Sequence, residues 1–229
     1  SDVAIQKIER STGERITQTF AVFDPTPIGA GSLACVYTAL LKNGEKVAVK
    51  VRRPDIELTL AADLRALGWL LQLPEWLSII RGGMTKNLRV ELHRMLMEEL
   101  DFNREARYTA LFAREARKKY QYVTAPKVYF ELSSQDVLVM EFISGVALAE
   151  LLGACDRNDT VTLERLAARD IDPKIIAERM VMSFNWGMLE NVLFHADPHP
   201  ANIIIQPGNK IVYIDFGSCG HMSSRHKRL

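Results

Sequence analysis

The chain has 229 residues, of which 48% are hydrophobic and 25% charged, and its formal net charge is +1 at pH 7. This length is sufficient for one bilobal domain with a substantial core, and the near-neutral charge gives no reason to expect nucleic-acid binding. No stretch reaches the ~18 consecutive apolar residues that a membrane-spanning helix needs. The three cysteines are widely spaced, which predicts a reducing, intracellular compartment.

The N-terminal part of the chain predicts one short helix followed by three strands. Apolar residues interspersed with charges favour a helix over residues 2–17. Residues 28–41 have the pattern of a strand, a glycine-rich turn and a second strand, and residues 46–51 form the next strand after the hairpin signal Asn43-Gly44. We therefore expect a small β-rich lobe.

Small residues in the turn between the first two strands predict a phosphate-binding loop. Such residues let the backbone approach anionic oxygens, so that successive amides can donate to them. The predicted loop consists of Gly29, Ala30, Gly31 and Ser32. Val36 and Ala48, on the two strands that follow, complete this side of the expected nucleotide site.

Lys50 is the strongest indication of an anionic ligand in this part of the chain. It lies in an apolar strand, where a lysine costs desolvation free energy unless it meets an anion. The α- and β-phosphates of ATP and a carboxylate from a helix are the expected partners. Residues 54–119 have helical sequence. Three acidic residues there fall on one helix face, so periodicity alone leaves open which of them meets Lys50: Glu98, Asp101 and Glu105.

Two further strands and a long helix are predicted before the last motifs. Residues 127–131 and 137–143 have strand character, and Ser144-Gly145 ends the first lobe. The end of the second strand is expected to form the hinge between the lobes, where backbone groups pair with adenine; the predicted contacts are Met140, Glu141 and Ile143. Asp172-Pro173 is an N-cap followed by proline at the first helical position, so it opens an apolar helix that extends to about Phe194.

The spacing of polar residues near the end of the chain predicts phosphoryl-transfer chemistry. Asp197 and Asn202 are five residues apart, and Asp215, in an Asp-Phe-Gly sequence, lies thirteen beyond Asn202. This is the layout of a kinase catalytic loop, a short hairpin and a metal-binding Asp-Phe-Gly. Asp197 is predicted to orient the nucleophile, whereas Asn202 and Asp215 supply oxygen ligands to Mg²⁺.

Two histidines accompany these residues. His195 and His199 are four apart, a spacing also found in paired zinc ligands. Pro198 and Pro200 disfavour a helix there, so zinc is not expected. His195 is expected to brace the loop through hydrogen bonds. For His199, contact with phosphate or with the Asp215 region and a purely structural role are both open.

Four motifs together resemble the UbiB-like atypical kinases, also called the ADCK family: residues 27–32, 47–54, 99–106 and 195–202. The resemblance covers essentially the whole chain. It implies a protein-kinase-like fold, binding of ATP and Mg²⁺, and a role that supports ubiquinone biosynthesis at a membrane. It also implies that Glu105 pairs with Lys50, while Glu99 and Asp101 form a separate Glu-x-Asp pair.

The chain departs from that family in two respects. The family's Lys-x-Gly-Gln element, which folds over the active site, is not present and is expected to precede Ser1 in a longer protein. The family's phosphate loop is typically alanine-rich, whereas this loop contains Gly29 and Gly31. In this respect the loop is closer to that of ordinary kinases.

The predicted fold class is α+β, a bilobal protein-kinase-like fold. Residues 1–145 are expected to form a β-rich N-lobe with an N-terminal helix and a helical insert at residues 54–119. Residues 146–229 are expected to begin a mainly helical C-lobe that contains the catalytic loop and the Asp-Phe-Gly sequence.

The predicted function is transfer of the γ-phosphoryl group of Mg·ATP to water or to a small or lipid-like acceptor, with Asp197, Lys50 and Glu105 as catalytic residues. Two alternatives are kept. A small-molecule kinase of the aminoglycoside or choline type has a similar His-x-Asp-x-His-x-x-Asn motif, but the helical insert and the Glu99-x-Asp101 pair argue against it. A nucleotide-sensing scaffold without turnover is disfavoured because all catalytic positions are filled.

Residues 69–80 bear on the expected partners. They are dense in large apolar side chains, which burial inside the protein explains best. The alternative is a partly exposed patch that contacts membrane lipid or a protein of the ubiquinone pathway. The expected location is intracellular and membrane-associated, at the bacterial cytoplasmic face or in a mitochondrion, without a transmembrane segment in this chain.

Overall fold

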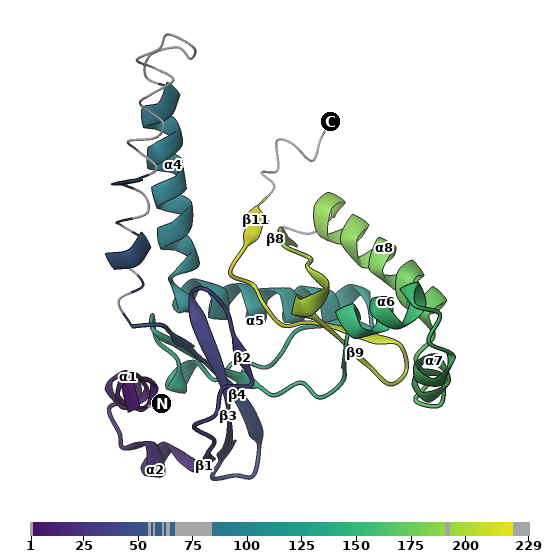
Figure 1. Cartoon of the computed structure of the whole chain (residues 1–229), viewed down its shortest axis with the longest axis horizontal. Coiled ribbons are helices and arrows are strands. Elements are labelled where there is room, and N and C mark those ends of the chain that lie inside the picture. Colours follow the sequence, from purple (N-terminus) through teal and green to yellow (C-terminus); the bar gives the residue numbers. More distant parts are fainter. Residues whose placement is uncertain are drawn as a thin grey trace.

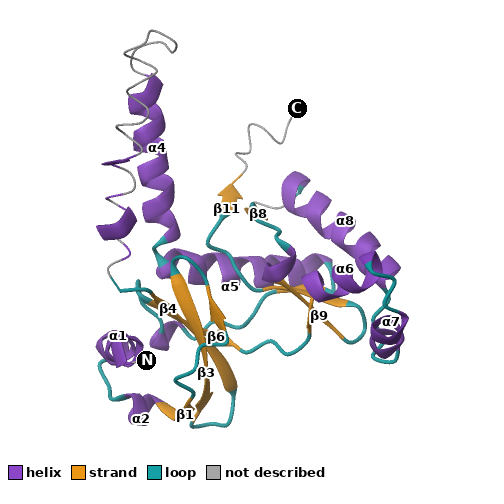
Figure 2. Ribbon diagram, in the orientation of Figure 1, coloured by secondary structure: helices purple, strands orange, loops and turns teal. Residues whose placement is uncertain are grey.

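In the computed structural model, the chain forms two lobes: an antiparallel sheet with short helices, and a helical part built around a smaller sheet (Figures 1 and 2). The fold is therefore α+β and bilobal, as predicted. The apolar stretch 69–80 lies outside the described residues. Those residues are 2–54, 56, 58–60, 62, 65, 66, 84–190 and 193–221.

The first lobe contains a five-stranded antiparallel sheet with the order β1-β3-β4-β6 and with β2 paired to β3. Its strands are β1 (Phe20–Phe23), β2 (Gly29–Ala30), β3 (Ala34–Leu41), β4 (Lys46–Arg52) and β6 (Val137–Glu141). The predicted N-terminal helix is divided into α1 (Asp2–Thr12) and α2 (Ile16–Thr19). Gly13 causes this division, because its φ of 72° ends the first helix.

Strand β4 is buried on both faces, which explains its nearly continuous apolar sequence. Ile8 of α1 packs with Val49 on one face. On the other face, Ala48 packs with Phe102 of helix α5 (Phe102–Lys119). Because side chains alternate along a strand, Lys50 lies on the same face as Ala48, toward α5 and the second lobe.

The prediction of one helix face shared by Glu98, Asp101 and Glu105 is wrong, because the helix is interrupted. Helix α4 (Met84–Glu99) ends before Asp101, and α5 begins after it. The Asp101 side chain accepts a hydrogen bond from the backbone N–H of Asn103 at 3.0 Å, so it acts as the N-cap of α5. Helix α4 then projects away from the body, while α5 runs across it (Figure 1).

Helix α5 contributes to the cores of both lobes. Near its start, Phe102 and Ala106 pack against the sheet of the first lobe. Near its end, Phe112 and Ala116 pack in the core of the second lobe with Trp186. The helix therefore connects the two cores, and the lobe boundary at residue 145 stays a prediction.

The segment after α5 differs from the prediction. Instead of a strand over 127–131, a short strand β5 (Val123–Thr124) pairs parallel with β10 (Lys210–Tyr213) of the second lobe. The predicted strand is reduced to a single bridge between Val128 and Met140. The chain leaves the sheet there because residues Phe130–Leu132 turn into a 3-10 helix, η1.

The second lobe has a four-stranded sheet with the order β5-β10-β9-β7, a two-stranded sheet of β8 and β11, and three helices among the described residues. No helix or strand was predicted for residues 146–171, which form the first three elements of this lobe. In chain order the elements are β7 (Val146–Ala147), α6 (Leu148–Asp156), α7 (Thr160–Ala167), α8 (Pro173–Leu189), β8 (Leu193–His195), η2 (Pro200–Asn202), β9 (Ile203–Gln206), β10 (Lys210–Tyr213) and β11 (Cys219–His221). None of the helices in the described part is long and apolar enough to cross a bilayer.

Helix α8 begins where the sequence predicted it. The Asp172 side chain accepts from the backbone N–H of Lys174 at 2.8 Å, and Pro173 occupies the first turn. The helix ends at Leu189, five residues before the predicted Phe194, because the chain re-enters a strand at Leu193.

Replacing Asp172 with alanine is expected to lower the free energy of unfolding by about 1 kcal/mol, because the first turn of α8 loses its acceptor. Asp172→Asn is the matched control, since asparagine is an equally good N-cap. Urea denaturation of the three proteins measures the effect. An equal loss in both variants would mean that the carboxylate charge, and not the cap, stabilises this turn.

Candidate active site

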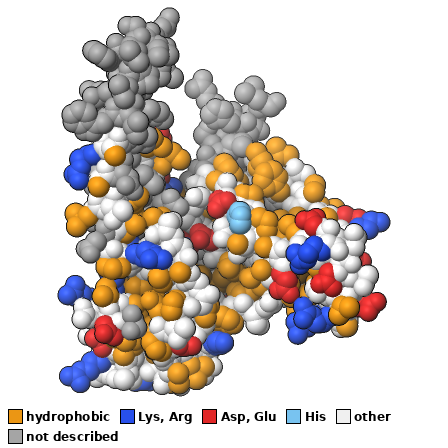
Figure 3. Space-filling model, in the orientation of Figure 1, with side chains coloured by type: hydrophobic (Ala, Val, Ile, Leu, Met, Phe, Trp, Pro, Cys, Tyr) orange, Lys and Arg blue, Asp and Glu red, His pale blue; other side chains and the backbone are white. Residues whose placement is uncertain are grey.

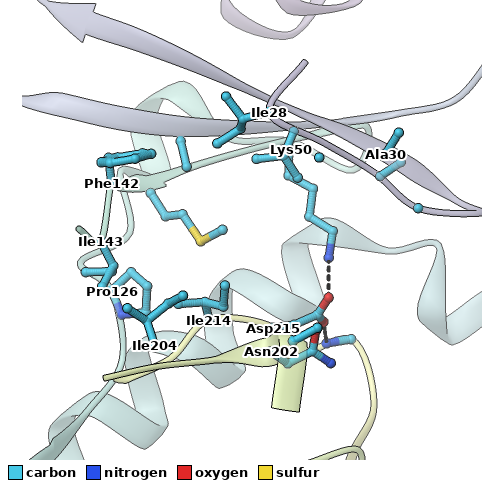
Figure 4. A pocket seen from close by; sticks show the side chains of 18 of the residues that line it. Ile28, Ala30, Lys50, Pro126, Phe142, Ile143, Asn202, Ile204, Ile214 and Asp215 are labelled. Carbon is cyan, nitrogen blue, oxygen red and sulfur yellow. Dashed lines mark hydrogen bonds and ion pairs between the residues drawn. The ribbon is translucent and has the colours of Figure 1, made fainter. Parts of the chain in front are cut away.

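A cavity of about 590 Å³ lies between the two lobes, below the glycine-rich loop (Figure 4). Figure 4 shows Lys50 extending from the sheet toward Asp215, which lies on the opposite wall beside Asn202. Every residue predicted to contact nucleotide or Mg²⁺ lines this cavity: Gly29, Ala30, Gly31, Ser32, Val36, Ala48, Lys50, Met140, Glu141, Ile143, Asn202 and Asp215.

Lys50 contacts two carboxylates. Its Nζ donates to Oε1 and Oε2 of Glu105, both at 2.9 Å, and to Oδ2 of Asp215 at 3.2 Å. Glu105 lies in the first turn of α5 and is only 2% exposed. Its Oε1 also accepts from the backbone N–H of Phe216 at 3.4 Å. One buried carboxylate therefore connects β4, α5 and the Asp-Phe-Gly segment.

The other two acidic candidates have different partners. Glu98 forms ion pairs with Arg94 at 3.4 Å and with Arg104 at 2.6 Å. Asp101 caps α5, and its Oδ2 lies 3.8 Å from Nη2 of Arg107. The geometry thus brings Glu105, and neither Glu98 nor Asp101, to Lys50. The side chain of Glu99 is outside the described part of the structure, so its pairing with Asp101 stays a prediction.

The charges at this site support one another. Burial disfavours the ammonium of Lys50, but Glu105 and Asp215 outweigh it and raise the pKa of this lysine. Burial likewise opposes the ionised form of Asp215, yet Lys50 lowers the pKa of that carboxyl. Burial raises the pKa of Glu105, and Lys50 counteracts the rise. At neutral pH the cavity therefore presents a cation and, opposite it, an ionised aspartate.

Asp215 and Asn202 are the residues suited to hold a metal ion. Oδ1 of Asp215 accepts from the Gly217 backbone N–H at 3.0 Å, which fixes the orientation of the carboxylate. The Asn202 amide donates to Oδ2 of Asp197 at 3.2 Å, so its own oxygen remains available as a ligand. A carboxylate and an amide oxygen are hard ligands of the kind that Mg²⁺ prefers, so this donor set fits the predicted ion. Figure 3 shows acidic side chains beside a histidine in the middle of the visible face, between the two lobes.

The two histidines have separate positions. His195 is buried at the end of β8, and its Nε2 donates to the backbone carbonyl of Asp215. Burial lowers the pKa of His195, which favours the neutral ring. His199 is exposed, and its Nδ1 accepts from the Ala201 backbone N–H at 3.2 Å at the start of η2. His195 thus braces the Asp-Phe-Gly segment, and His199 stabilises the turn that leads to Asn202.

Two backbone N–H groups of the predicted hinge already donate hydrogen bonds to other parts of the first lobe. The N–H of Glu141 donates to the carbonyl of Lys127 at 2.8 Å, and that of Phe142 donates to Lys46 at 3.1 Å. Ile143 follows these contacts and lines the cavity. Adenine recognition at Met140, Glu141 and Ile143 stays a prediction.

Sequence reasoning missed the apolar walls of the cavity. Pro126 and Phe142 lie near the hinge, while Ile204 and Ile214 come from the hairpin below it (Figure 4). Ile204 faces the cavity between the buried residues Ile203 and Ile205, but three consecutive isoleucines carry no alternation in the sequence that distinguishes it. Side chains of this kind suit the faces of a planar nucleobase.

Cys219 is expected to react slowly with iodoacetamide at pH 8. Burial, together with the nearby carboxylates of Glu105 and Asp215, raises the pKa of its thiol to about 12. The reactive thiolate is therefore scarce until the pH approaches that value. Peptide mass spectrometry of labelled protein measures the rate, with urea-denatured protein as the control. Equal labelling of Cys219 in folded and denatured protein would contradict the prediction.

A bilobal α+β fold in which a strand lysine, a helix glutamate and the aspartate of Asp-Phe-Gly meet at an interlobe cavity defines a kinase-like protein. A family model described as "ABC1 atypical kinase-like domain" matches residues 1–229. The chain belongs to this family, as the resemblance predicted.

Similar proteins come from chloroplasts and from bacteria. Protein ACTIVITY OF BC1 COMPLEX KINASE 7, chloroplastic, of Arabidopsis thaliana is 33% identical over 223 residues, which are 97% of the chain and 30% of the relative. Probable protein kinase UbiB of Cronobacter sakazakii is 33% identical over 236 residues, 99% of the chain and 40% of the relative. The chain thus spans less than half the length of these curated relatives.

A solved structure supports the same fold. Rv3197 of Mycobacterium tuberculosis, in a complex with erythromycin, superposes with a TM-score of 0.73 at 26% sequence identity. The alignment covers 97% of this chain and 52% of that protein.

Proposed function

We propose that the chain binds Mg·ATP and transfers the γ-phosphoryl group to water or to a small or lipid-like acceptor. One observation carries the proposal: Lys50 is held by Glu105 and Asp215 at the cavity that the glycine-rich loop covers. A buried lysine with two carboxylate partners is charged and rigidly placed, as the binding of a triphosphate requires.

Each residue has a distinct proposed part in the reaction. Lys50, fixed by Glu105, holds the α- and β-phosphates, while backbone amides of residues 29–32 cover them. Asp215 and Asn202 hold Mg²⁺, which neutralises charge on the phosphates when it is bound. Asp197 orients the nucleophile and accepts its proton. Its hydrogen bond from Asn202 keeps this carboxylate beside the metal ligands.

The proposed physiological role is support of ubiquinone biosynthesis at a membrane. It rests on membership of the ABC1 family and on relatives named as UbiB. The acceptor is proposed to be water or a small or lipid-like molecule. Membrane lipid and proteins of the ubiquinone pathway are the proposed partners.

The direct test is ATP turnover by the full-length protein, with and without liposomes, combined with a screen for phosphorylated acceptors. Lys50→Met serves as the inactive control, because it removes the phosphate-binding charge. We expect phosphate release or acceptor phosphorylation that depends on Mg²⁺ and that the control lacks. Tight Mg·ATP binding without turnover under all conditions would instead support a nucleotide-sensing scaffold.

Asp215→Asn is expected to weaken Mg·nucleotide binding strongly, because it removes the charged ligand from the proposed metal site. Isothermal titration calorimetry with ATP, in the presence of Mg²⁺ and of EDTA, measures the effect. We expect the dependence on Mg²⁺ to disappear in the variant. Unchanged Mg·ATP affinity would place the metal ligand elsewhere.

A further inference from the structure

Two arginines that follow Lys50 contact the phosphate loop and the segment that leads into the helix carrying Glu105. Arg52 ends β4, and Arg53 comes directly after it. Both belong to the motif at residues 47–54, but no role was predicted for either, and neither lines the cavity formed by the described residues. Their contacts nevertheless connect them to the glycine-rich loop and to the start of α5, both of which line the cavity.

Arg53 is attached to the glycine-rich loop. Its side-chain Nε donates to the carbonyl of Gly31 at 2.9 Å, and its backbone N–H donates to the carbonyl of Leu33 at 2.9 Å. Gly31 and Leu33 both line the cavity. Within the loop, the N–H of Gly31 donates to the carbonyl of Ala34 at 2.9 Å. The Arg53 contacts connect this turn to the residue after β4, so they are placed to fix its position.

Arg52 is attached to the joint between α4 and α5. Its guanidinium forms an ion pair with Asp136 and donates to the carbonyl of Leu100 at 3.4 Å. Leu100 lies between the end of α4 and the N-cap Asp101, where helix carbonyls lack intrahelical partners and carry partial negative charge. Arg52 is 8% exposed, whereas the Asp136 side chain is 40% exposed, so the ion pair is buried on the arginine side only.

The same joint is held by the backbone. The N–H of Phe102 donates to the carbonyl of Gln135 at 3.3 Å, and the N–H of Arg52 donates to Asp136 at 2.9 Å. The first turn of α5, which contains Glu105, is thus connected to the strand that contains Lys50 through Arg52 and the segment before β6. This joint is therefore a contact that bears on the position of Glu105 relative to Lys50.

We propose that Arg52 and Arg53 are positioning residues for the nucleotide site: Arg53 fixes the phosphate loop, and Arg52 fixes the α5 helix that brings Glu105 to Lys50. The proposal rests on the proposed Mg·ATP-dependent function. In this proposal, β4 carries the phosphate-binding Lys50. The two arginines that follow fix the phosphate loop and helix α5 on either side of that lysine.

The test compares Arg52→Met and Arg53→Met with the parent and with Arg165→Met in the full-length protein. Arg165 is a matched control, because it is an exposed arginine whose ion pair with Glu150 lies on α6 and α7. Hydrogen exchange without nucleotide reports position independently of any activity. We expect faster exchange at residues 28–33 in Arg53→Met only, and at residues 101–106 in Arg52→Met only.

Binding and turnover provide the second readout. Arg53→Met is expected to raise the Kd of Mg·ATP about five-fold with little change in kcat, the effect of one lost charge-assisted hydrogen bond. Arg53→Lys is expected to restore most of the affinity, because a lysine can donate to the Gly31 carbonyl. Arg52→Lys is expected to restore less of the affinity lost in Arg52→Met. A single ammonium cannot contact both Asp136 and Leu100 as the guanidinium does.

The outcomes separate this proposal from the proposed function. If hydrogen exchange changes locally as expected but the protein does not bind Mg·ATP, the positioning roles of Arg52 and Arg53 stand and the proposed function is rejected. Normal Mg·ATP binding with exchange unchanged in both variants, or accelerated equally throughout the protein, would overturn the proposal. Altered exchange in Arg165→Met would overturn it as well.

Discussion

Asp197→Asn is expected to lower turnover by roughly 10²–10⁴-fold, the usual size of a general-base effect, while Mg·ATP still binds. The asparagine keeps the shape of the side chain but cannot accept the proton of the nucleophile. In the structure, Oδ2 of Asp197 accepts a hydrogen bond from Asn202 at 3.2 Å, so the carboxylate is oriented beside the proposed metal ligands.

Single-turnover kinetics and calorimetry together test this expectation, since they separate chemistry from binding. Glu164→Gln is the matched control, because it neutralises an exposed carboxylate on α7. Turnover equal to that of the parent would place the base elsewhere or leave only the scaffold function. Loss of Mg·ATP binding in parallel with turnover would assign Asp197 to the metal site.

Breaking the Lys50–Glu105 pair is the second large effect. Glu105→Gln is expected to weaken Mg·ATP binding about as much as Lys50→Met does. Removing one partner of a buried ion pair costs about 3–5 kcal/mol where the remaining charge has no other partner. Lys50 keeps its contact with Asp215 at 3.2 Å, so the cost in Glu105→Gln lies below that range. Glu98→Gln is the matched control, since Glu98 pairs with Arg94 and Arg104 instead.

A double-mutant cycle measures the coupling directly. Nucleotide affinity is determined for the parent, for each single variant and for the double variant Lys50→Met with Glu105→Gln. We expect strong coupling between positions 50 and 105 and none between positions 50 and 98. The opposite pattern would mean that the α4–α5 joint has another arrangement in solution.

The sequence predicted which polar residues lie together better than it predicted the elements that carry them. Asp197, Asn202 and Asp215 could be grouped because their spacing matches that of a kinase catalytic loop and Asp-Phe-Gly segment. Choosing Glu105 over Glu98 needed family resemblance, because helical periodicity assumes a continuous helix. Asp101 interrupts that helix by capping the next one, and a single N-cap inside a helical pattern is a weak local signal.

Other features depend on contacts between distant parts of the chain. Strand β5 has only two residues and exists because it pairs with β10, almost ninety residues later. Gly145 was predicted only to end a lobe, yet an added Cβ there would lie 2.5 Å from the carbonyl of Ile205 on β9. Neither pairing nor such close approach leaves a pattern in the local sequence.

Because α5 is packed into the cores of both lobes, the lobes cannot separate widely without exposing apolar surface at one end of that helix. Entry and exit of a nucleotide would then be governed by opening of the loop at residues 29–32 and not by rotation of whole lobes. Such an enzyme would keep nearly the same radius of gyration throughout its catalytic cycle. Substitutions in that loop would change its product release rate strongly. Solvent viscosity, which slows the relative motion of whole lobes, would change that rate much less.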